Sequence, residues 1–414
     1  MTKRRLLVLA HRAPVPPLTG EKMRLWRFLQ GLAPDWEITL AAPVDRAEDW
    51  ESRAALSGLG LAEILLGDLT KRSRAASGLK ALNSGAPVSL EHFHDAGLSA
   101  RIREAARKTP FDAVLLYGSG GARYLEALPD PRPPVILDMV DVDSAKWEDL
   151  AEKSAPPMGW VYAREARRLK RVEEALARSS AACLFATPAE RDLFAKRGGA
   201  GNLLAVENGV DCDYWAAGKT MASPYPDDRI PRVIFTGAMD YPPNVEAAVW
   251  FAREILPRAK ALAGPFEFVA AGARPAKEVL ALQEMGVRVT GRVEDMRPWL
   301  AHAAAAVAPL RLARGVQNKL LEAMASRVPT VATPAALEGI QATPGADLLT
   351  SASASEFAAA LARLLLDSRL SALLSANAFR AMRDRYDWSS RLEALEAALL
   401  QALAEPPDRK QDAA

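Results

Sequence analysis

Residues 308–340 have the sequence APLRLARGVQNKLLEAMASRVPTVATPAALEGI, the pattern of a strand end, a loop, a helix, a second strand and a second loop. Gly315 interrupts the chain before the helix. We expect the helix to begin near Val316 or Gln317, because the apolar residues that follow recur at helical spacing. A strand, a loop and a helix in this order are the repeating unit of an α/β fold.

The polar face of this helix carries Asn318, Lys319 and Glu322. A lysine in the first turn opposes the positive end of the helix dipole, and a bound anion would remove the conflict. Free N–H groups at a helix N-terminus make a phosphate site together with such a lysine, and Glu322, one turn further on, can accept hydrogen bonds from a ribose diol. The alternative is an ordinary amphipathic helix with a solvated lysine and glutamate, and the helix alone leaves both open.

Composition bounds the class of protein. A chain of 414 residues that is 50% hydrophobic is long enough for two domains, and 53 basic against 51 acidic residues give no overall field that would attract nucleic acid. Two cysteines, Cys183 and Cys212, are too few for a disulfide framework. The apolar run at residues 6–10 is too short for a signal peptide, and no window approaches the length of a membrane span. We expect a cytoplasmic protein that meets a membrane, if at all, at its surface.

Strands and helices alternate along both halves of the chain, which predicts parallel sheets with crossover helices. In the first helix we expect Lys22 and Arg24 to point outward. The expected strands are 5–10, 37–42, 63–66, 113–117, 135–139, 182–186, 232–237, 266–272, 287–291, 305–310 and 329–332; the expected helices are 21–32, 47–56, 97–108, 160–178, 188–196, 244–255, 276–283, 298–304, the one after Gly315, 355–366 and 389–404.

A change of composition divides the chain. Residues 217–231 are rich in Gly, Lys, Ser, Pro and Asp without periodicity, and we interpret them as a linker. The prediction is an α/β protein of two Rossmann-like, doubly wound parallel-sheet domains, at residues 1–216 and 232–386, which face each other across a cleft. The tail 405–414 is expected to be disordered.

Three strand-end loops of the second domain carry glycine, which lets a backbone approach a ligand closely. One such loop is weak support, because tight turns need glycine anyway, but three accompany the helix that carries Lys319. They contain Gly237, Gly272 with Arg274, and Gly291 with Arg292 and Val293.

With these loops the chain resembles the group-one glycosyltransferases of the GT-B fold over nearly its whole length. The resemblance rests on NGVD at 208–211, FTGAMDYPPN at 235–244, VTGRVEDMRPWLAHA at 289–303 and KLLEAMASRVPTVAT at 319–333. More narrowly, HRAPVPPLTGEKMR at 11–24, LDMVDVDSAKW at 137–147 and PLRLARGVQNKLLEAMA at 309–325 are similar to sugar transferases of exosortase (PEP-CTERM) exopolysaccharide loci.

The resemblance implies a retaining, metal-independent enzyme without a cofactor, which moves a sugar from a nucleotide-diphosphate sugar to a polysaccharide or lipid-linked acceptor. The first domain would bind the acceptor and the second the donor, with a C-terminal helix, 387–404, returning to the first domain. The implied catalytic residues are Lys319, Arg314 and Asp141; the implied donor-binding residues are Gly237, Gly272, Arg274, Gly291, Arg292, Val293, Gly315, Val316, Gln317, Asn318 and Glu322.

The chain departs from the family pattern at two places. Many members have a glutamate where this chain has Arg314, and they carry an arginine and lysine pair on the first helix of the second domain that MDYPPNVEAAVW lacks. Lys319, with Arg314 or Arg274, could supply the positive charge that a departing diphosphate needs. Arg314 is also the best argument for a rival hypothesis, a catalytically silent nucleotide-sugar-binding subunit. A further alternative is a nucleotide-sugar epimerase on the same fold.

Candidate acceptor or phosphate ligands follow the first strand: His11, Arg12, Gly20 and Arg24. The carboxyl end of a strand favours this reading over a loop merely fixed by prolines. Asp138, Asp141 and Asp143 follow another strand, and we assign acceptor-hydroxyl recognition to Asp141, with capping or metal binding as alternatives.

Three further motifs have ordinary explanations beside functional ones. His92 and His94 could bind zinc but fit a polar loop better, and GSGG at 118–121 lacks the spacing of a dinucleotide fingerprint. The basic run on helix 160–178 could be a solvated face or could meet an anionic membrane together with Lys71, Arg72 and Arg74. It comprises Arg164, Arg167, Arg168, Lys170 and Arg171.

Overall fold

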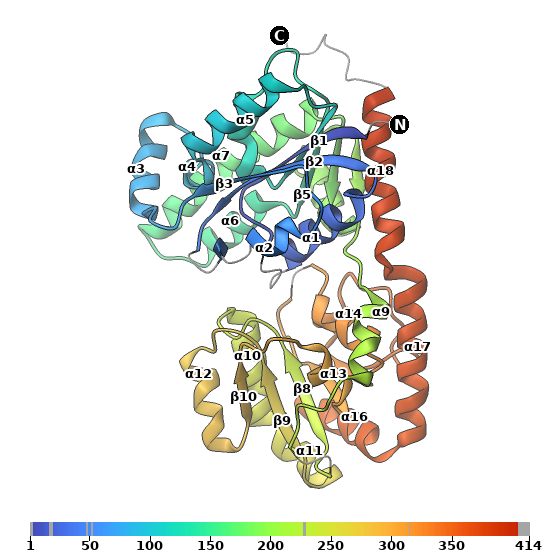
Figure 1. The fold of residues 1–414 in the computed structure, drawn as a ribbon. Coiled ribbons are helices and arrows are strands. Elements are labelled where there is room, and N and C mark those ends of the chain that lie inside the picture. The colour runs from blue at the N-terminus through green and yellow to red at the C-terminus, as the bar shows by residue number, and fades with distance from the viewer. Residues whose placement is uncertain are drawn as a thin grey trace. The chain divides into compact units, whose positions relative to one another are not determined.

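The computed structural model describes residues 3–15, 20–46, 49–50, 53–226, 229–313 and 315–404 (Figure 1). By its internal contacts the chain divides into two compact units. The first unit is Met1–Glu207 with Arg391–Ala414, and the second unit is Asn208–Ser390. None of the helices in these described ranges is long and apolar enough to span a bilayer.

A seven-stranded parallel sheet forms the first unit, in the order β3-β2-β1-β4-β5-β6-β7. Its central strands are apolar runs because helices lie on both faces of the sheet (Figure 1). The order reverses between β1 and β4, so the connections that follow these two strands leave in opposite directions, and a crevice forms beyond the carboxyl ends of the strands. The strands are β1 Arg4–Ala10, β2 Trp36–Val44, β3 Glu63–Asp68, β4 Ala113–Tyr117, β5 Val135–Val140, β6 Ala182–Phe185 and β7 Leu203–Ala205.

The helices of the first unit include four that the sequence periodicity did not predict, namely α3 Arg74–Ser84, α4 Val88–Phe93, the 3₁₀ helix η2 Ser119–Ala127 and α6 Asp143–Glu152. Residues 47–56 were expected to be helical; residues 49–50 have 3₁₀ conformation and α2 covers Arg53–Ser57, whereas residues 47, 48, 51 and 52 lie outside the described ranges. The other helices are α1 Gly20–Leu32, α5 Ala96–Lys108, α7 Met158–Ser179 and α8 Pro188–Lys196.

A six-stranded parallel sheet forms the second unit, in the order β10-β9-β8-β11-β12-β13, with its reversal between β8 and β11. The strands are β8 Arg232–Thr236, β9 Glu267–Ala271, β10 Arg288–Gly291, β11 Ala305–Ala308, β12 Thr330–Ala332 and β13 Leu349–Thr350. The helices are α9 Cys212–Ala216, η3 Ala217–Thr220, α10 Pro242–Trp250, the π-helical η4 Phe251–Ile255, α11 Leu256–Ala263, α12 Lys277–Leu280, η5 Ala281–Met285, α13 Arg297–Ala301, α14 Asn318–Ala325, α15 Pro334–Leu337, α16 Ala354–Leu366 and α17 Ser368–Tyr386.

The boundary between the units differs from the one expected at residue 216. Residues 208–216 belong to the second unit, where α9 packs against α13 and α14. Much of the expected linker 217–231 is also folded onto this unit, since Tyr225 is buried and its hydroxyl donates to the Trp299 carbonyl at 2.6 Å. Composition alone could not predict this, because a single buried aromatic residue, Tyr225, anchors the segment.

The last helix, α18 Trp388–Ala404, belongs to the first unit from Arg391 onward. A Cβ built on Gly31 of α1 would lie 2.3 Å from Cδ1 of Leu392, so α1 and α18 pack closely there. Residues 405–414, expected to be disordered, lie outside the described ranges.

Candidate functional site

Two of the predicted glycine loops touch each other in the second unit. Strands β8 and β9 end side by side, with Thr236 opposite Ala271, and Gly237 and Gly272 follow them. Gly272 has φ +153°, and a Cβ built on it would lie 1.7 Å from the Gly237 carbonyl oxygen. A side-chain methyl group at residue 272 would overlap the backbone of Gly237, which cannot move aside as a flexible side chain could. Glycine is therefore required at this contact.

We expect Gly272→Ala to destabilise the second unit by about 2–4 kcal/mol, because the methyl group overlaps backbone rather than a flexible side chain. Gly286→Ala is the matched control: Gly286 also has positive φ, +77°, but open space around its Cβ. The control is expected to cost about 1 kcal/mol, from backbone strain alone. Urea unfolding followed by circular dichroism measures both, and equal midpoints would contradict the proposed crowding.

Helix α14 begins at Asn318 and holds Lys319 beside the loop after β8. The Lys319 ammonium donates to Oδ1 of Asn244 at 2.5 Å, and Nδ2 of Asn244 donates to the Ala238 carbonyl at 2.9 Å. The ammonium also lies 4.9 Å from the ring centroid of Phe235. Asn244, which the sequence analysis did not single out, therefore ties Lys319 to the glycine loop at the reversal point of the sheet.

Lys319 and Glu322 have pKa values that converge on neutrality. Burial lowers the pKa of Lys319 to about 8, although Glu322 opposes the shift. Burial raises the pKa of Glu322 to about 7, although Lys319 opposes that shift. Two titrating groups brought together in this way are typical of a functional site.

Asn318 adds an unsatisfied acceptor next to this pair. Its Oδ1 is buried, and no described residue donates a hydrogen bond to it. A buried amide oxygen without a donor is unfavourable, so a ligand N–H or O–H would stabilise this position.

The other predicted donor-side residues are placed as follows. Arg274, with φ +52°, is held by Asp240 at 2.6 Å and 3.2 Å on the adjacent loop, so it is not a free cation. Gly291 and Gly315 have φ +65° and +70° and open space around them. Arg292 is exposed, Val293, Val316 and Gln317 are half-buried, and Arg314 lies outside the described residues.

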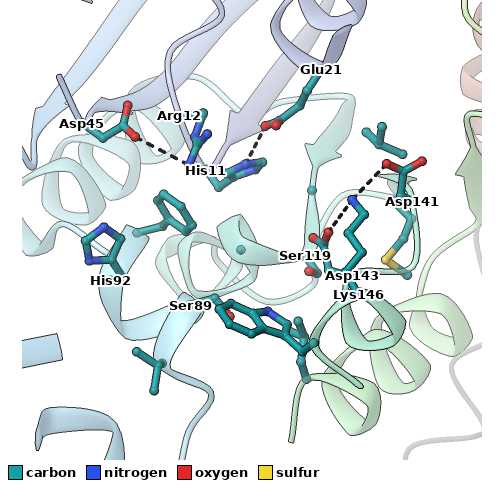
Figure 2. A pocket seen from close by; sticks show the side chains of 18 residues that line it. His11, Arg12, Glu21, Asp45, Ser89, His92, Ser119, Asp141, Asp143 and Lys146 are labelled. Atoms are coloured by element: carbon teal, nitrogen blue, oxygen red, sulfur yellow. Dashed lines mark hydrogen bonds and ion pairs between the residues drawn. The ribbon is translucent and has the colours of Figure 1, made fainter. Parts of the chain in front are cut away.

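A second site lies in the first unit at the crevice between β1 and β4. It is a cavity of about 430 Å³ whose lining includes three of the predicted residues, His11, Arg12 and Asp141 (Figure 2). Gly20, the first residue of α1, and Arg24 do not line it. Asp143, His92 and Ser119 also line it, although the sequence analysis did not assign them to an acceptor site. The sequence analysis gave no individual role to the remaining polar and aromatic lining: Glu21, Asp45, Ser89, Phe93, Lys146 and Trp147.

His11 is paired with a carboxylate in this cavity. Its Nε2 lies 2.7 Å from Oε1 of Glu21, and its Nδ1 lies 3.2 Å from the Tyr117 carbonyl, which can only accept. Burial alone would lower the pKa of His11, but the Glu21 carboxylate outweighs it and the pKa is raised. Burial likewise opposes the effect of His11 on Glu21, whose pKa is nevertheless lowered to about 2. Because both ring nitrogens face oxygen atoms that accept, this environment favours the protonated form of His11.

The other charges of the cavity are also paired. Arg12 lies 3.6 Å from Asp45 and stacks over Phe93, and Lys146 lies 2.9 Å from Asp141 and 3.0 Å from Asp143. Each of the three cations therefore already faces a carboxylate (Figure 2). Such a lining suits hydroxyl groups, which both donate and accept, better than a phosphate, which needs unpaired cations.

The outward orientation expected for Arg24 and Lys22 is wrong. Arg24 is 0% exposed, donates to Asp138 of β5 at 2.8 Å and packs over Phe28, while Lys22 is buried against Asp49 at 2.7 Å. These positions lie on the core face of α1, where a charged residue is tolerated because a buried carboxylate meets it.

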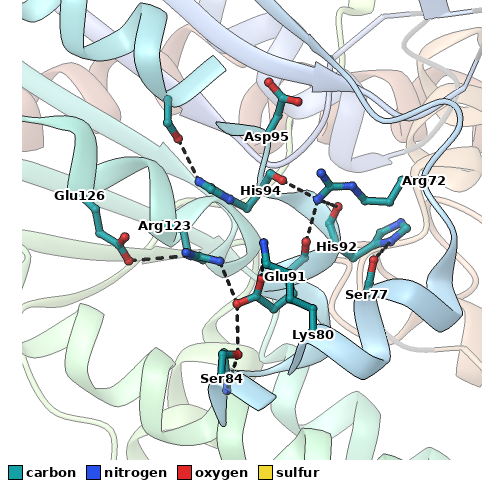
Figure 3. Close-up of polar contacts among 12 residues, drawn as sticks. Arg72, Ser77, Lys80, Ser84, Glu91, His92, His94, Asp95, Arg123 and Glu126 are labelled. Carbon is teal, nitrogen blue, oxygen red and sulfur yellow. Dashed lines mark hydrogen bonds and ion pairs between the residues drawn. The ribbon is translucent and has the colours of Figure 1, made fainter. Parts of the chain in front are cut away.

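His92 and His94 were expected in a polar loop, but His92 lies in the last turn of α4 and His94 caps this helix; both belong to a network of polar contacts (Figure 3). Nδ1 of His92 lies 3.3 Å from Oγ of Ser77, and Nε2 of His94 lies 3.0 Å from Oγ of Ser99. Arg72 donates to the carbonyls of Glu91 and His94. In the described part of the chain no three His, Cys, Asp or Glu side chains converge as a metal site would require.

The predicted basic face of α7 is partly engaged. Arg164 donates to the Ala81 carbonyl at 2.9 Å, Lys170 lies 3.8 Å from Glu174, and Arg168 is half-buried, whereas Arg167 and Arg171 are exposed. Apolar side chains that the sequence analysis did not single out are exposed around the first turn of this helix: Leu150, Met158, Trp160 (71% exposed) and Val161.

Comparisons with known proteins agree with this architecture. The chain is similar to an Anabaena protein, HepE, in complex with UDP and glucose (15% identity, TM-score 0.66, 96% of this chain and 100% of that chain covered). It is also similar to sucrose-phosphate synthase from Thermosynechococcus elongatus (15%, 0.65, 97% and 100%) and to a UDP-forming α,α-trehalose-phosphate synthase from Burkholderia xenovorans (13%, 0.63, 98% and 100%). The chain has the GT-B fold, with two Rossmann-like parallel-sheet units.

The match to a protein family lies within the second unit. Residues 230–367 match the family described as Glycosyl transferases group 1, which supports the broad resemblance inferred from the sequence over less than half of the chain. The matched segment contains Gly237, Asn244, Lys319 and Glu322. No curated protein matches the sequence.

Proposed function

We propose that this protein is a retaining, metal-independent glycosyltransferase that moves a sugar from a nucleotide-diphosphate sugar to a polysaccharide or lipid-linked acceptor in exopolysaccharide biosynthesis. The observation that carries the proposal is the Lys319–Glu322 pair, tied by Asn244 to the Gly237 loop within the segment that matches group 1 glycosyl transferases. Two proteins of similar fold, HepE in complex with UDP and glucose and the UDP-forming trehalose-phosphate synthase, support a nucleotide-sugar donor.

In this proposal Lys319 and the first N–H groups of α14 bind the diphosphate, and Glu322 accepts hydrogen bonds from the ribose. Breaking the bond between the sugar and the diphosphate places negative charge on the leaving phosphate, which a fixed cation stabilises. The acceptor attacks from the same face, and the leaving phosphate takes its proton. Arg314 would add positive charge to this end of the site.

The acceptor would bind in the cavity of the first unit, where Asp141 holds a hydroxyl group. The paired charges around His11, Arg12 and Lys146 offer alternating donors and acceptors to a sugar ring. Phe93 and Trp147 supply aromatic surface. A neutral sugar at the growing end of an acceptor fits this lining better than a phosphate group.

Thermal-shift measurements with UDP-, GDP- and ADP-sugars, followed by an assay of nucleotide diphosphate release with and without acceptor extract, test the function. Acceptor-dependent release supports transfer. Binding of a nucleotide sugar without turnover would instead favour a catalytically silent binding subunit. This is the second candidate function, because Arg314 stands where many members of the family have a glutamate.

We expect donor affinity to be greatest between about pH 7 and 8. Below pH 7 Glu322 becomes protonated, so it loses its negative charge and part of its capacity to accept from both hydroxyls of the ribose; above pH 8 Lys319 loses the charge that binds phosphate. Affinity should fall by up to about tenfold per pH unit on each side. Calorimetric titration with a UDP-sugar measures this. Lys319→Arg should remove the alkaline decline alone, since arginine keeps its charge, and an unchanged alkaline limb would contradict the assignment.

We further propose that α7 brings the protein to the anionic inner face of the plasma membrane. Exposed Trp160 and Val161 would enter the interface while Arg167 and Arg171 meet lipid headgroups. We expect flotation with anionic but not neutral vesicles, and Arg167→Glu/Arg171→Glu to weaken binding at least about tenfold, at about 1 kcal/mol per charge. Arg103→Glu/Arg107→Glu on α5 makes the same charge change and should leave binding intact. Equal flotation of both variants would refute the surface.

A further inference from the structure

Buried carboxylates bind the backbone N–H groups of the segment Val140–Ser144, which connects β5 to α6. The Val140 N–H donates to Oδ1 of Asp138 at 3.1 Å, the Val142 N–H to Oε2 of Glu190 at 2.8 Å, and the Ser144 N–H to Oε1 of Glu173 at 3.0 Å. Every second backbone N–H is thus bound by a carboxylate from a different element: β5, α8 and α7.

These contacts fix a backbone that would not adopt its conformation unaided. Val140 has φ +65°, which is rare for a β-branched residue and costs energy. The register of β5 against β6 also shifts between Asp138 and Val140. Helix α6 has no side-chain cap of its own at Val142, so Glu173 supplies from α7 the acceptor that its first turn needs.

The intervening residues face the cavity. Asp141 and Asp143 both pair with Lys146 of α6, and all three side chains line the cavity (Figure 2). The N–H groups of residues 140, 142 and 144 are therefore bound by buried carboxylates, while residues 141 and 143 present carboxylates to the cavity. Glu173 is 0% exposed and Glu190 5% exposed, so neither can touch a ligand.

We propose that Glu173 and Glu190 are positioning residues for the candidate acceptor cavity: by binding the N–H groups of Ser144 and Val142, they hold Asp141, Asp143 and Lys146 in the arrangement that receives acceptor hydroxyls. This inference rests on the proposed function for the identity of the ligand. The proposal that two distant carboxylates hold this segment does not depend on the proposed function.

An acceptor oxygen at position 173 is all that the arrangement requires. Burial raises the pKa of Glu173 to about 7, so the side chain need not be ionised to accept from Ser144. Glu173→Gln keeps an acceptor oxygen, whereas Glu173→Met has a similar volume and no such acceptor. The two variants thus separate hydrogen bonding from packing, and Glu174→Ala, one position further along α7 and paired with Lys170, controls for the helix.

The experiment applies two methods to each full-length variant. Hydrogen exchange by mass spectrometry follows residues 140–146, and steady-state kinetics give KM for the acceptor and for the donor. We expect Glu173→Met to accelerate exchange in this segment and to raise acceptor KM at least about tenfold, since small displacements of positioned groups are costly, with donor KM unchanged. Glu173→Gln and Glu174→Ala should match the wild type.

The outcomes are distinguishable. Absence of turnover in the wild type with every acceptor would defeat the proposed function, and hydrogen exchange would still decide the positioning role. Wild-type exchange at residues 140–146 in Glu173→Met would overturn the inference. Equal acceleration across the whole first unit in Met and Gln variants would overturn it as well, because it would indicate general destabilisation. If Glu173→Met does not fold, Glu190→Gln and Glu190→Met provide the same comparison at Val142.

Discussion

Replacing Lys319 with methionine is expected to lower the rate of sugar transfer about 10²- to 10³-fold at saturating donor. Methionine keeps much of the length and apolar volume of the side chain but removes the charge beside the departing diphosphate. Losing one such preorganised group commonly costs about 3–4 kcal/mol of transition-state stabilisation. Initial rates of nucleotide diphosphate release measure the effect.

The affinity for the donor should fall less than the rate. A charge-assisted hydrogen bond to the ground-state phosphate contributes about 1.5–3 kcal/mol, whereas the charge that develops during bond cleavage appears only in the transition state. Lys277→Met, at an exposed lysine of the same unit, is the matched control and should leave both quantities unchanged. A Lys319→Met enzyme with normal turnover would show that the leaving group is stabilised elsewhere, with Arg314 the first candidate.

Much of the fold could be predicted because its information is local. The strand predicted at 5–10 corresponds to β1, and the helix predicted at 188–196 corresponds to α8, because buried parallel strands form apolar runs and α8 starts at a capping threonine followed by proline. Lys319 and Glu322 could be singled out for the same reason, since they lie one turn apart on a single helix.

Features that depend on distant partners could not be predicted in this way. Helix α6 begins at residues that resemble a carboxylate-rich loop, and its first turn is capped by Glu173, 29 positions away. Asn244 is 75 positions from Lys319, and without that contact it is an unremarkable residue in the first turn of a helix. Helix α3 was not among the predicted helices, although Ser73 caps it and Gly85 ends it.

Arg24 shows the same limitation and leads to the prediction with the largest effect on stability. Its guanidinium and the carboxylate of Asp138 are both 0% exposed, and the NH1 group also donates to the Val206 carbonyl at 2.6 Å. Burial raises the pKa of Asp138 even though Arg24 lowers it, so the pair offsets only part of the cost of removing the carboxylate from water. The pair therefore contributes little net stability, but either partner alone is strongly unfavourable.

We expect Arg24→Met to destabilise the first unit by about 3–5 kcal/mol, because it leaves the Asp138 carboxylate buried without its cation. At about 2–4 °C per kcal/mol for a unit of this size, its melting temperature should fall by roughly 6–20 °C in differential scanning calorimetry. The control Lys108→Met removes an exposed ion pair to Glu104 in the same unit and should leave the transition where it was.

The double variant Arg24→Met/Asp138→Leu separates stability from positioning. With both charges gone, most of the lost stability should return, and the double-mutant cycle should give a coupling of several kcal/mol. The strained Val140 would still lack the Asp138 oxygen that binds its N–H, so hydrogen exchange at residues 140–146 should remain faster than in the wild type. Recovery of stability together with wild-type exchange would show that the pair only balances charge and does not hold the cavity segment.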